Sequence, residues 1–177
     1  MGWSAAENLV NKDAEIAAAN HPNIRIFHVA SRTASTPQVD CDASWAQCTP
    51  EKMHHTRAVG YFFARRLMEK LNIPVGIIVS AWGGTPYETW TKKELIENSP
   101  LLASKAPVGE NEHRPNLTGT CYNLMIHPVI PYSIAGVIWY QGETNVGNPY
   151  YAMGLQTMIN GWRNDFGKEF PFYLVQI

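Results

Sequence analysis

Charged residues are scarce in this sequence, and neither sign is in excess. Asp, Glu, Lys and Arg make up 16% of its 177 residues, against about 25% in an average soluble protein. Fourteen basic residues oppose fifteen acidic ones and leave a formal net charge of -1. This balance provides no basic surface for nucleic acid or for an anionic membrane. We therefore expect neither among the partners of the protein.

Long hydrophobic runs are also lacking. The run at residues 134–140 is typical, and none approaches the ~18 residues of a membrane-spanning helix. The first residues do not have the basic segment and following apolar segment of a signal peptide. Hydrophobic residues nevertheless make up 45% of the chain and aromatic residues 11%. This is enough apolar surface for a folded core, and the length fits one domain.

Cysteine is rare, which excludes a scaffold held by several disulfide bonds. Cys41 and Cys48 lie close together in a polar stretch and could form a disulfide bond, which would leave Cys121 without a disulfide partner. A zinc site that combined Cys41 and Cys48 with His54 and His55 would match no common ligand spacing. We therefore expect no metal site.

Patterns of helix and strand alternate along the chain. Helical spacing of apolar residues predicts helices over residues 5–19, 50–71, 92–97 and 150–166. Short apolar runs predict strands over residues 24–29, 75–79, 134–140 and 172–177. Polar stretches predict long loops over residues 30–48 and 99–121. Strands that alternate with helices indicate an α/β domain with a mostly parallel sheet.

The longest predicted helix, residues 50–71, has a marked start and an apolar stripe. Thr49 is placed to cap it, and Pro50 fits its first position. The stripe, which we expect to face the core, consists of Val59, Phe63, Leu67 and Leu71, with Phe62 beside them.

Two polar, glycine-containing loops follow predicted buried strands. Residues 82–85 (WGGT) come after the strand at 75–79, and residues 141–145 (QGETN) come after the strand at 134–140. In open parallel sheets, ligands bind beyond the carboxyl ends of the strands. We therefore expect these two loops to form the functional site.

The two loops contain the donor groups of an oxyanion hole. Gly83 and Gly84 lack a Cβ, so their backbone N–H groups can approach a ligand closely. The side-chain amide of Asn145 is a further donor, and donors aimed at one point stabilise the anion that forms in acyl transfer. Glu143 has the chemistry to orient a histidine, and Gln141 to hold a polar substrate. Each pattern alone is also typical of an ordinary turn.

Aromatic and histidine side chains near the loops are candidates for substrate contact. Trp82, Trp90 and Trp139 cluster around the two loops in the sequence, which suits stacking on a sugar face, although tryptophans also fit a core. His127 is a further candidate because a short turn separates it from the strand that leads to Asn145.

A serine nucleophile is not evident in the sequence. The Gly-x-Ser-x-Gly motif of many esterases is absent. The segment most similar to this motif is GWSAA, which contains Ser4, but Ser4 lies at the start of a predicted helix and follows no predicted strand. We therefore do not assign Ser4 as a nucleophile.

Three stretches of the chain together resemble one family. They are SAWGGTPYETW at residues 80–90, YNLMIHPVIPYSIAGVIWYQGETN at residues 122–145, and the segment that follows as far as FPFYLVQI. All three are similar to the sialate O-acetylesterase family, a branch of the SGNH hydrolases that is related to acetylxylan esterases. The WYQGETN stretch after a buried strand is the most specific part.

The resemblance implies a fold and a place of this chain within it. The fold is the flavodoxin-like, three-layer SGNH-hydrolase sandwich with a mostly parallel sheet. Residues 1–177 would be an internal portion of one such esterase domain, incomplete at both ends. The family's serine would lie two residues before Met1, and its catalytic histidine beyond Ile177. We therefore expect the chain by itself to be inactive.

The resemblance also implies site residues and a function. The glycine donor of the family corresponds to Gly83 or Gly84, its asparagine donor to Asn145, and the partner of its catalytic histidine to Glu143. The implied function is a carbohydrate O-acetylesterase that acts on acetylated sialic acid. Acetylated xylan or another glycan is an alternative substrate, and a non-catalytic glycan-binding module is an alternative function. The family implies no metal or organic cofactor and a periplasmic or secreted location, and it leaves the oligomeric state open.

Overall fold

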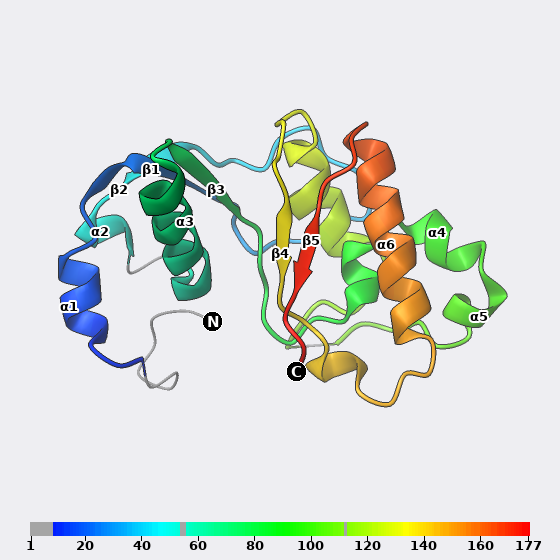
Figure 1. Cartoon of the computed structure of the whole chain (residues 1–177). Coiled ribbons are helices and arrows are strands. Elements are labelled where there is room, and N and C mark those ends of the chain that lie inside the picture. The colour runs from blue at the N-terminus through cyan, green and yellow to red at the C-terminus, as the bar shows by residue number, and fades with distance from the viewer. Residues whose placement is uncertain (1–8, 54–55, 112) are drawn as a thin grey trace. The chain divides into compact units, whose positions relative to one another are not determined.

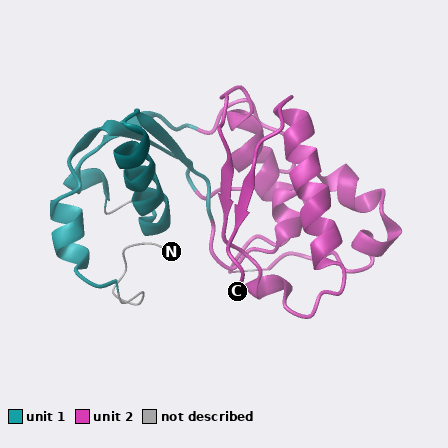
Figure 2. Ribbon diagram, in the orientation of Figure 1, with its two compact units in different colours: residues 1–30, 42–81 teal, residues 31–41, 82–177 magenta. Residues whose placement is uncertain are grey.

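The computed structural model describes residues 9–53, 56–111 and 113–177. The chain forms two compact units, which are shown in Figures 1 and 2. The first unit consists of residues 1–30 and 42–81, and the second of residues 31–41 and 82–177. All of the predicted site residues belong to the second unit.

Strand β1 is the central strand of the sheet in the first unit. β1 (His21–His28) pairs antiparallel with β2 (Trp45–Cys48) and parallel with β3 (Val75–Val79). Helix α3 (Ala58–Leu71) packs against β1 and β3, and α2 (Pro50–Met53) packs against β2. The strand predicted at 75–79 is confirmed at both ends. Its bounds are well determined by the sequence, because a proline precedes the apolar run and a glycine turn follows it.

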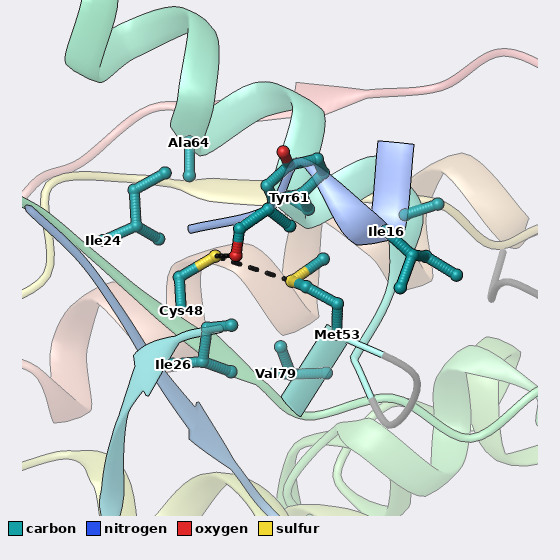
Figure 3. Packing of buried hydrophobic residues seen from close by; sticks show 10 residues of the cluster. Ile16, Ile24, Ile26, Cys48, Met53, Tyr61, Ala64 and Val79 are labelled. Carbon is teal, nitrogen blue, oxygen red and sulfur yellow. Dashed lines mark hydrogen bonds between the residues drawn. The ribbon is translucent and has the colours of Figure 1, made fainter. Parts of the chain in front are cut away.

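The elements of the first unit enclose a small apolar core, which Figure 3 shows. Ile24 and Ile26 of β1 and Val79 of β3 contribute aliphatic side chains from the sheet. Tyr61 and Ala64 of α3 close the core from the helix. The core thus joins the sheet to α3.

Cys48 is a packing group of this core and not half of a disulfide bond. It is fully buried, and its Sγ lies 3.6 Å from both the Met53 Sδ and the Ala19 carbonyl oxygen (Figure 3). Burial raises the pKa of the thiol, so it stays protonated at neutral pH. No disulfide bond joins Cys48 to Cys41 in the structure, so the pairing that the sequence left open is not formed.

The buried face of α3 differs from the predicted stripe. Phe63 is 37% exposed and Leu71 is 57% exposed. The buried residues of the helix are Ala58, Gly60, Tyr61 and Ala64. Small side chains allow the helix to lie close to the sheet, and a Cβ added at Gly60 would lie 3.6 Å from Ile77. The prediction was wrong for Phe63 and Leu71, because close packing selected small side chains, whereas Phe62 does pack against the core.

The helix predicted over residues 50–71 is divided into α2 and α3. Arg57, directly before α3, has an extended backbone with φ −106° and ψ 126°, which interrupts the helical path. The predicted start is confirmed, because Thr49 Oγ1 accepts the Lys52 N–H at 3.4 Å, as an N-cap residue does.

The first predicted helix is shorter than its pattern. Of residues 5–19, the described part forms only α1 (Lys12–Ala17). Asn11 has a left-handed backbone with φ 57°, so the helix begins after it. The earlier part of the predicted helix, with Ser4, lies outside the described residues.

The second unit is built around two parallel strands joined by a long helix. β4 (Val137–Trp139) and β5 (Phe172–Leu174) pair in parallel, and α6 (Tyr151–Asp165) connects them (Figure 1). In its described residues the unit also contains shorter helices, which are η2 (Tyr87–Trp90), α4 (Lys93–Glu97), α5 (Pro100–Ala103), η3 (Tyr122–Ile126), η4 (His127–Val129) and η5 (Glu143–Asn145). α6 contacts both α4 and η2.

Tryptophan rings fill the core of the second unit. Trp139 packs edge-on against Trp90 and Trp162, with ring centroids 6.5 Å and 5.9 Å apart. The Trp162 indole N–H donates to the Trp90 carbonyl oxygen at 2.9 Å. Trp90 is 4% exposed and Trp139 is 9% exposed, so both are core residues and cannot stack on a sugar. The prediction for these two rings was wrong; Trp82 is half-buried and stays a candidate.

The α/β class is confirmed, and the pairing of the sheets is mixed. β1–β3 and β4–β5 are parallel, whereas β1–β2 is antiparallel. β4 and β5 are shorter than the strands predicted at 134–140 and 172–177. Each has three residues, because the pairing between them extends over three positions. β2 and α5 fall within segments that were predicted to be loops. Within the described residues, every helix is too short or too polar to cross a membrane.

Candidate functional site

Hydrogen bonds join the two predicted loops. The Gln141 side-chain amide donates to the Thr85 carbonyl oxygen at 3.2 Å and to Asn145 Oδ1 at 2.7 Å. The Tyr87 backbone N–H also donates to Asn145 Oδ1, at 3.0 Å. The WGGT turn and the QGETN loop therefore lie together in the second unit. That their donor groups aim at one point stays a prediction.

The WGGT turn has a fixed internal geometry. Thr85 Oγ1 donates to the Trp82 carbonyl oxygen at 2.8 Å and closes the turn. The same hydroxyl accepts the Trp90 indole N–H at 2.9 Å. Because Thr85 is 2% exposed and Trp90 belongs to the core, the turn is attached to the interior of the unit.

Arg114 lies across the two glycines of this turn. Its Nη1 donates to the Gly83 carbonyl oxygen at 2.5 Å. Gly84 has φ +76°, a conformation that favours glycine, and a Cβ there would collide with the Arg114 guanidinium. The left-handed backbone favours glycine at position 84, whereas the exposed end of the Arg114 side chain can move aside.

Asn145 is a buried side chain whose amide is bonded on both sides. It is 8% exposed and ends the short helix η5. Its Oδ1 accepts two hydrogen bonds, and its Nδ2 donates to Glu88 Oε2 at 2.9 Å. These contacts fix which end of the amide faces which neighbour.

Gln141 is oriented by Tyr151 of α6. The Tyr151 hydroxyl donates to Gln141 Oε1 at 2.9 Å and lies 3.0 Å from the Gln141 carbonyl oxygen. Burial raises the pKa of Tyr151, which keeps the hydroxyl protonated as a donor. Gln141 can therefore present only its amide nitrogen to Asn145. Its contacts are with the protein, and its predicted role toward substrate stays a prediction.

Glu143 and His127 lie outside this hydrogen-bond network. Glu143 begins η5 and is exposed to solvent, so its carboxylate is accessible to a partner. His127 Nδ1 lies 2.8 Å from the Gln38 carbonyl oxygen, and its ring packs edge-on against Tyr122. Among the described residues, neither contact of His127 involves the loops.

Cys41, Cys48, His54 and His55 were the residues considered for a zinc site. Within the described part of the chain, no group of three or more His, Cys, Asp or Glu side chains is placed to hold a metal ion. His54 and His55 lie outside the described residues. Cys48 is enclosed in the core of the first unit.

Sequence patterns did not single out Glu88, Arg114 or Tyr151. Glu88 stands in the run YETW, directly after Tyr87 and two residues before Trp90, and these large aromatic residues are a signal of burial that could have been followed. Arg114 is 31 residues from its partner Gly83, and Tyr151 begins a helix. No short-range pattern connects either residue to the site.

Comparisons with known proteins show the family of the chain and a similar fold. The chain belongs to the carbohydrate esterase family of sialic acid-specific acetylesterases, which matches residues 6–177. It is 30% identical over 177 aligned residues to the sialate O-acetylesterases of Pongo abelii and of Homo sapiens. In each case the match covers 90% of this chain and 34% of the relative, so the chain spans about a third of the relatives' length.

A solved structure is similar as well. It is a carbohydrate acetylesterase from Xanthomonas citri, which superimposes with a TM-score of 0.82 and is 34% identical. The superposition covers 94% of this chain and 36% of that protein.

Proposed function

We propose that the natural protein that carries this chain is a serine esterase that removes acetyl groups from a sugar, with acetylated sialic acid as the favoured substrate. The observation that carries the proposal is that Gln141 donates hydrogen bonds both to Thr85 of the WGGT turn and to Asn145, and so holds the two loops together. Membership of the sialic acid-specific acetylesterase family supports the substrate class. We further propose the three-layer SGNH-hydrolase sandwich as the complete fold and a periplasmic or secreted location.

The chemistry follows the usual course of acyl transfer. A serine hydroxyl attacks the ester carbonyl carbon while a histidine takes its proton, and the carbonyl oxygen becomes an oxyanion. The sugar alcohol leaves with the proton returned by the histidine, and water then releases acetate from the serine in the same two steps. By family resemblance, this chain provides the oxyanion donors, and neither a metal nor an organic cofactor is required.

Each site residue has a proposed role. The backbone N–H of Gly83 or Gly84 and the Nδ2 of Asn145 donate to the oxyanion. Glu143 orients the catalytic histidine. The Glu143 side chain is exposed, so its carboxylate is accessible to that histidine. Trp82, which is half-buried, contacts the sugar. Gln141 and His127 are assigned to substrate binding, Gln141 through the loop it anchors.

Replacement of Asn145 tests this proposal. In the natural protein, Asn145→Ala should lower kcat on an acetyl ester about 10²- to 10³-fold, the usual effect of removing one oxyanion donor. Asn164→Ala is the matched control, because Asn164 is exposed on α6. Thermal unfolding of both variants shows whether each remains folded.

Two results would contradict the proposal. One is an unchanged kcat in a folded Asn145→Ala protein. The other is a wild-type protein that binds acetylated glycan but releases no acetate, which would favour the glycan-binding module instead.

A further inference from the structure

Glu88 is an acidic side chain in the interior of the second unit. It is 0% exposed and belongs to η2, in which every residue is buried. No ion pair of the described residues includes it. Its carboxyl oxygens instead accept side-chain amides, from Asn145 at 2.9 Å and from Asn148 at 3.4 Å.

Stability alone does not account for a carboxyl group at this position. Burial raises the pKa of Glu88, because the charged form loses its hydration and gains no cation. An apolar side chain of similar size would avoid this cost. What a carboxyl group adds here is a hydrogen-bond acceptor that faces Asn145.

That acceptor determines the orientation of the Asn145 amide. Oδ1 of Asn145 faces two donors, the Tyr87 N–H and the Gln141 amide nitrogen, whereas Nδ2 faces the Glu88 acceptor. If the amide were rotated by half a turn, Nδ2 would face both donors and Oδ1 would face a carboxyl oxygen. All three hydrogen bonds would be lost, so one orientation is strongly preferred.

We propose that Glu88 is a positioning residue that holds Asn145 so that the second hydrogen of its Nδ2 is directed at the acyl oxygen of the substrate. Nδ2 carries two hydrogens, and the bond to Glu88 Oε2 uses one of them. This inference rests on the proposed function, in which Asn145 donates to the oxyanion. Glu88 itself does not touch the substrate.

Two replacements of similar volume separate the acceptor from the space it fills. Glu88→Gln keeps a carbonyl acceptor for Asn145, whereas Glu88→Met fills the space without one. In the natural protein, Glu88→Met should lower kcat about 10- to 100-fold with little change in KM. This loss is smaller than that of Asn145→Ala, because Glu88→Met misorients the Asn145 donor and does not remove it. Glu88→Gln should restore kcat to within about threefold of the wild type. Glu97→Gln is the control, because Glu97 is exposed on α4.

A double-variant cycle shows whether Glu88 acts through Asn145. We expect Glu88→Met combined with Asn145→Ala to have a kcat within about twofold of Asn145→Ala alone. Losses that multiply would overturn the inference, as would a folded Glu88→Met protein with wild-type kcat. If Asn145→Ala itself leaves kcat unchanged, the proposed function fails, which is a distinct result.

Nuclear magnetic resonance of the wild type tests the inference without any variant. The two Nδ2 hydrogens of Asn145 should exchange with solvent at unequal rates, because one is bonded to buried Glu88 and the other faces the site. Equal exchange of the two hydrogens, whether fast or slow, would overturn the assignment even if Glu88→Met did not fold.

Discussion

At the scale of the residue, Gly84 has the most restrictive surroundings in the WGGT turn. Its φ of +76° disfavours a side chain, and a Cβ there would also displace the exposed Arg114 guanidinium. Gly83 is its neighbour in sequence and is less restricted. A Cβ at Gly83 would lie 3.8 Å from Arg114 Nη1, which is an ordinary contact distance. The pair therefore offers a matched comparison.

We expect Gly84→Ala to lower the free energy of unfolding by about 1–2 kcal/mol relative to Gly83→Ala, the cost of a left-handed backbone in an L-residue. Denaturant unfolding of the two variants measures the difference. A second measurement, with Arg114→Ala added to Gly84→Ala, separates the steric collision from the backbone strain. Equal stabilities of the Gly83 and Gly84 variants would show that the turn is not held in this conformation.

The buried carboxyl group of Glu88 gives a prediction on pH. Its pKa lies above the ordinary value of 4.5, because burial raises it more than the Asn145 hydrogen bond lowers it. The folded state therefore holds this proton more tightly than the unfolded state does. The resulting stabilisation is fully present below pH 4.5, falls as the pH rises toward the folded pKa, and is lost above it.

Glu88→Gln removes this titration and serves as the reference. Denaturant unfolding between about pH 4 and pH 8 should show the wild type losing stability relative to Glu88→Gln as the pH rises. A difference that is constant with pH, or that grows in favour of the wild type, would contradict the raised pKa.

Sequence patterns identified some of these residues and missed others for a physical reason. Gly83, Gly84 and Asn145 were identified as candidates because they follow apolar strands in polar loops. Glu88 was not, because its partner Asn145 lies 57 residues away and the contact exists only in the folded unit. A pattern within one segment indicates the chemical groups that a residue offers. Which groups it contacts depends on tertiary packing.

At the scale of the element, α6 fits against η2 through a glycine. A Cβ added at Gly154 would collide with the ring of Tyr87, which is fully buried. Gly161 in the same helix differs, because a Cβ there would lie 2.6 Å from Leu95 Cδ1, the far end of a flexible side chain. Position 154 therefore controls how closely α6 approaches the segment that holds Glu88.

We expect Gly154→Ala to lower the free energy of unfolding by about 1–3 kcal/mol, as overpacking of a rigid ring does. Gly161→Ala should be close to neutral, because the helix propensity gained, about 1 kcal/mol, offsets a movement of Leu95. Thermal or denaturant unfolding of both variants measures this. A Gly154→Ala protein as stable as the Gly161→Ala protein would show that α6 does not pack tightly on Tyr87.

Elements were predicted well where a local pattern determines them and poorly where packing does. The strand at 75–79 was identified with its bounds, and α6 differs from its prediction by one residue at each end. In α3, Phe63 was wrongly assigned to the core, because the buried positions of that face are taken by small residues such as Ala58 and Ala64. Size complementarity between a helix and a sheet is not visible in either sequence segment alone.

At the scale of the whole molecule, the predicted site is confined to one of the two compact units. Every predicted site residue lies in the second unit, and so do Glu88 and Arg114. The alternation of strands and helices gave the α/β class, but it could not give the separate pairing of β1–β3 and β4–β5. Which strands become neighbours depends on contacts far apart in the sequence.

The central claim is that the WGGT turn and Asn145 together bind the oxyanion of an acetyl-ester hydrolysis. A crystal structure of the natural protein inactivated by a methylphosphonate ester tests it most directly, because the tetrahedral adduct imitates the intermediate. We predict that one phosphonyl oxygen lies about 2.7–3.1 Å from Asn145 Nδ2 and from the backbone nitrogen of Gly83 or Gly84. An adduct whose oxygens contact neither Asn145 nor these glycines would contradict the account.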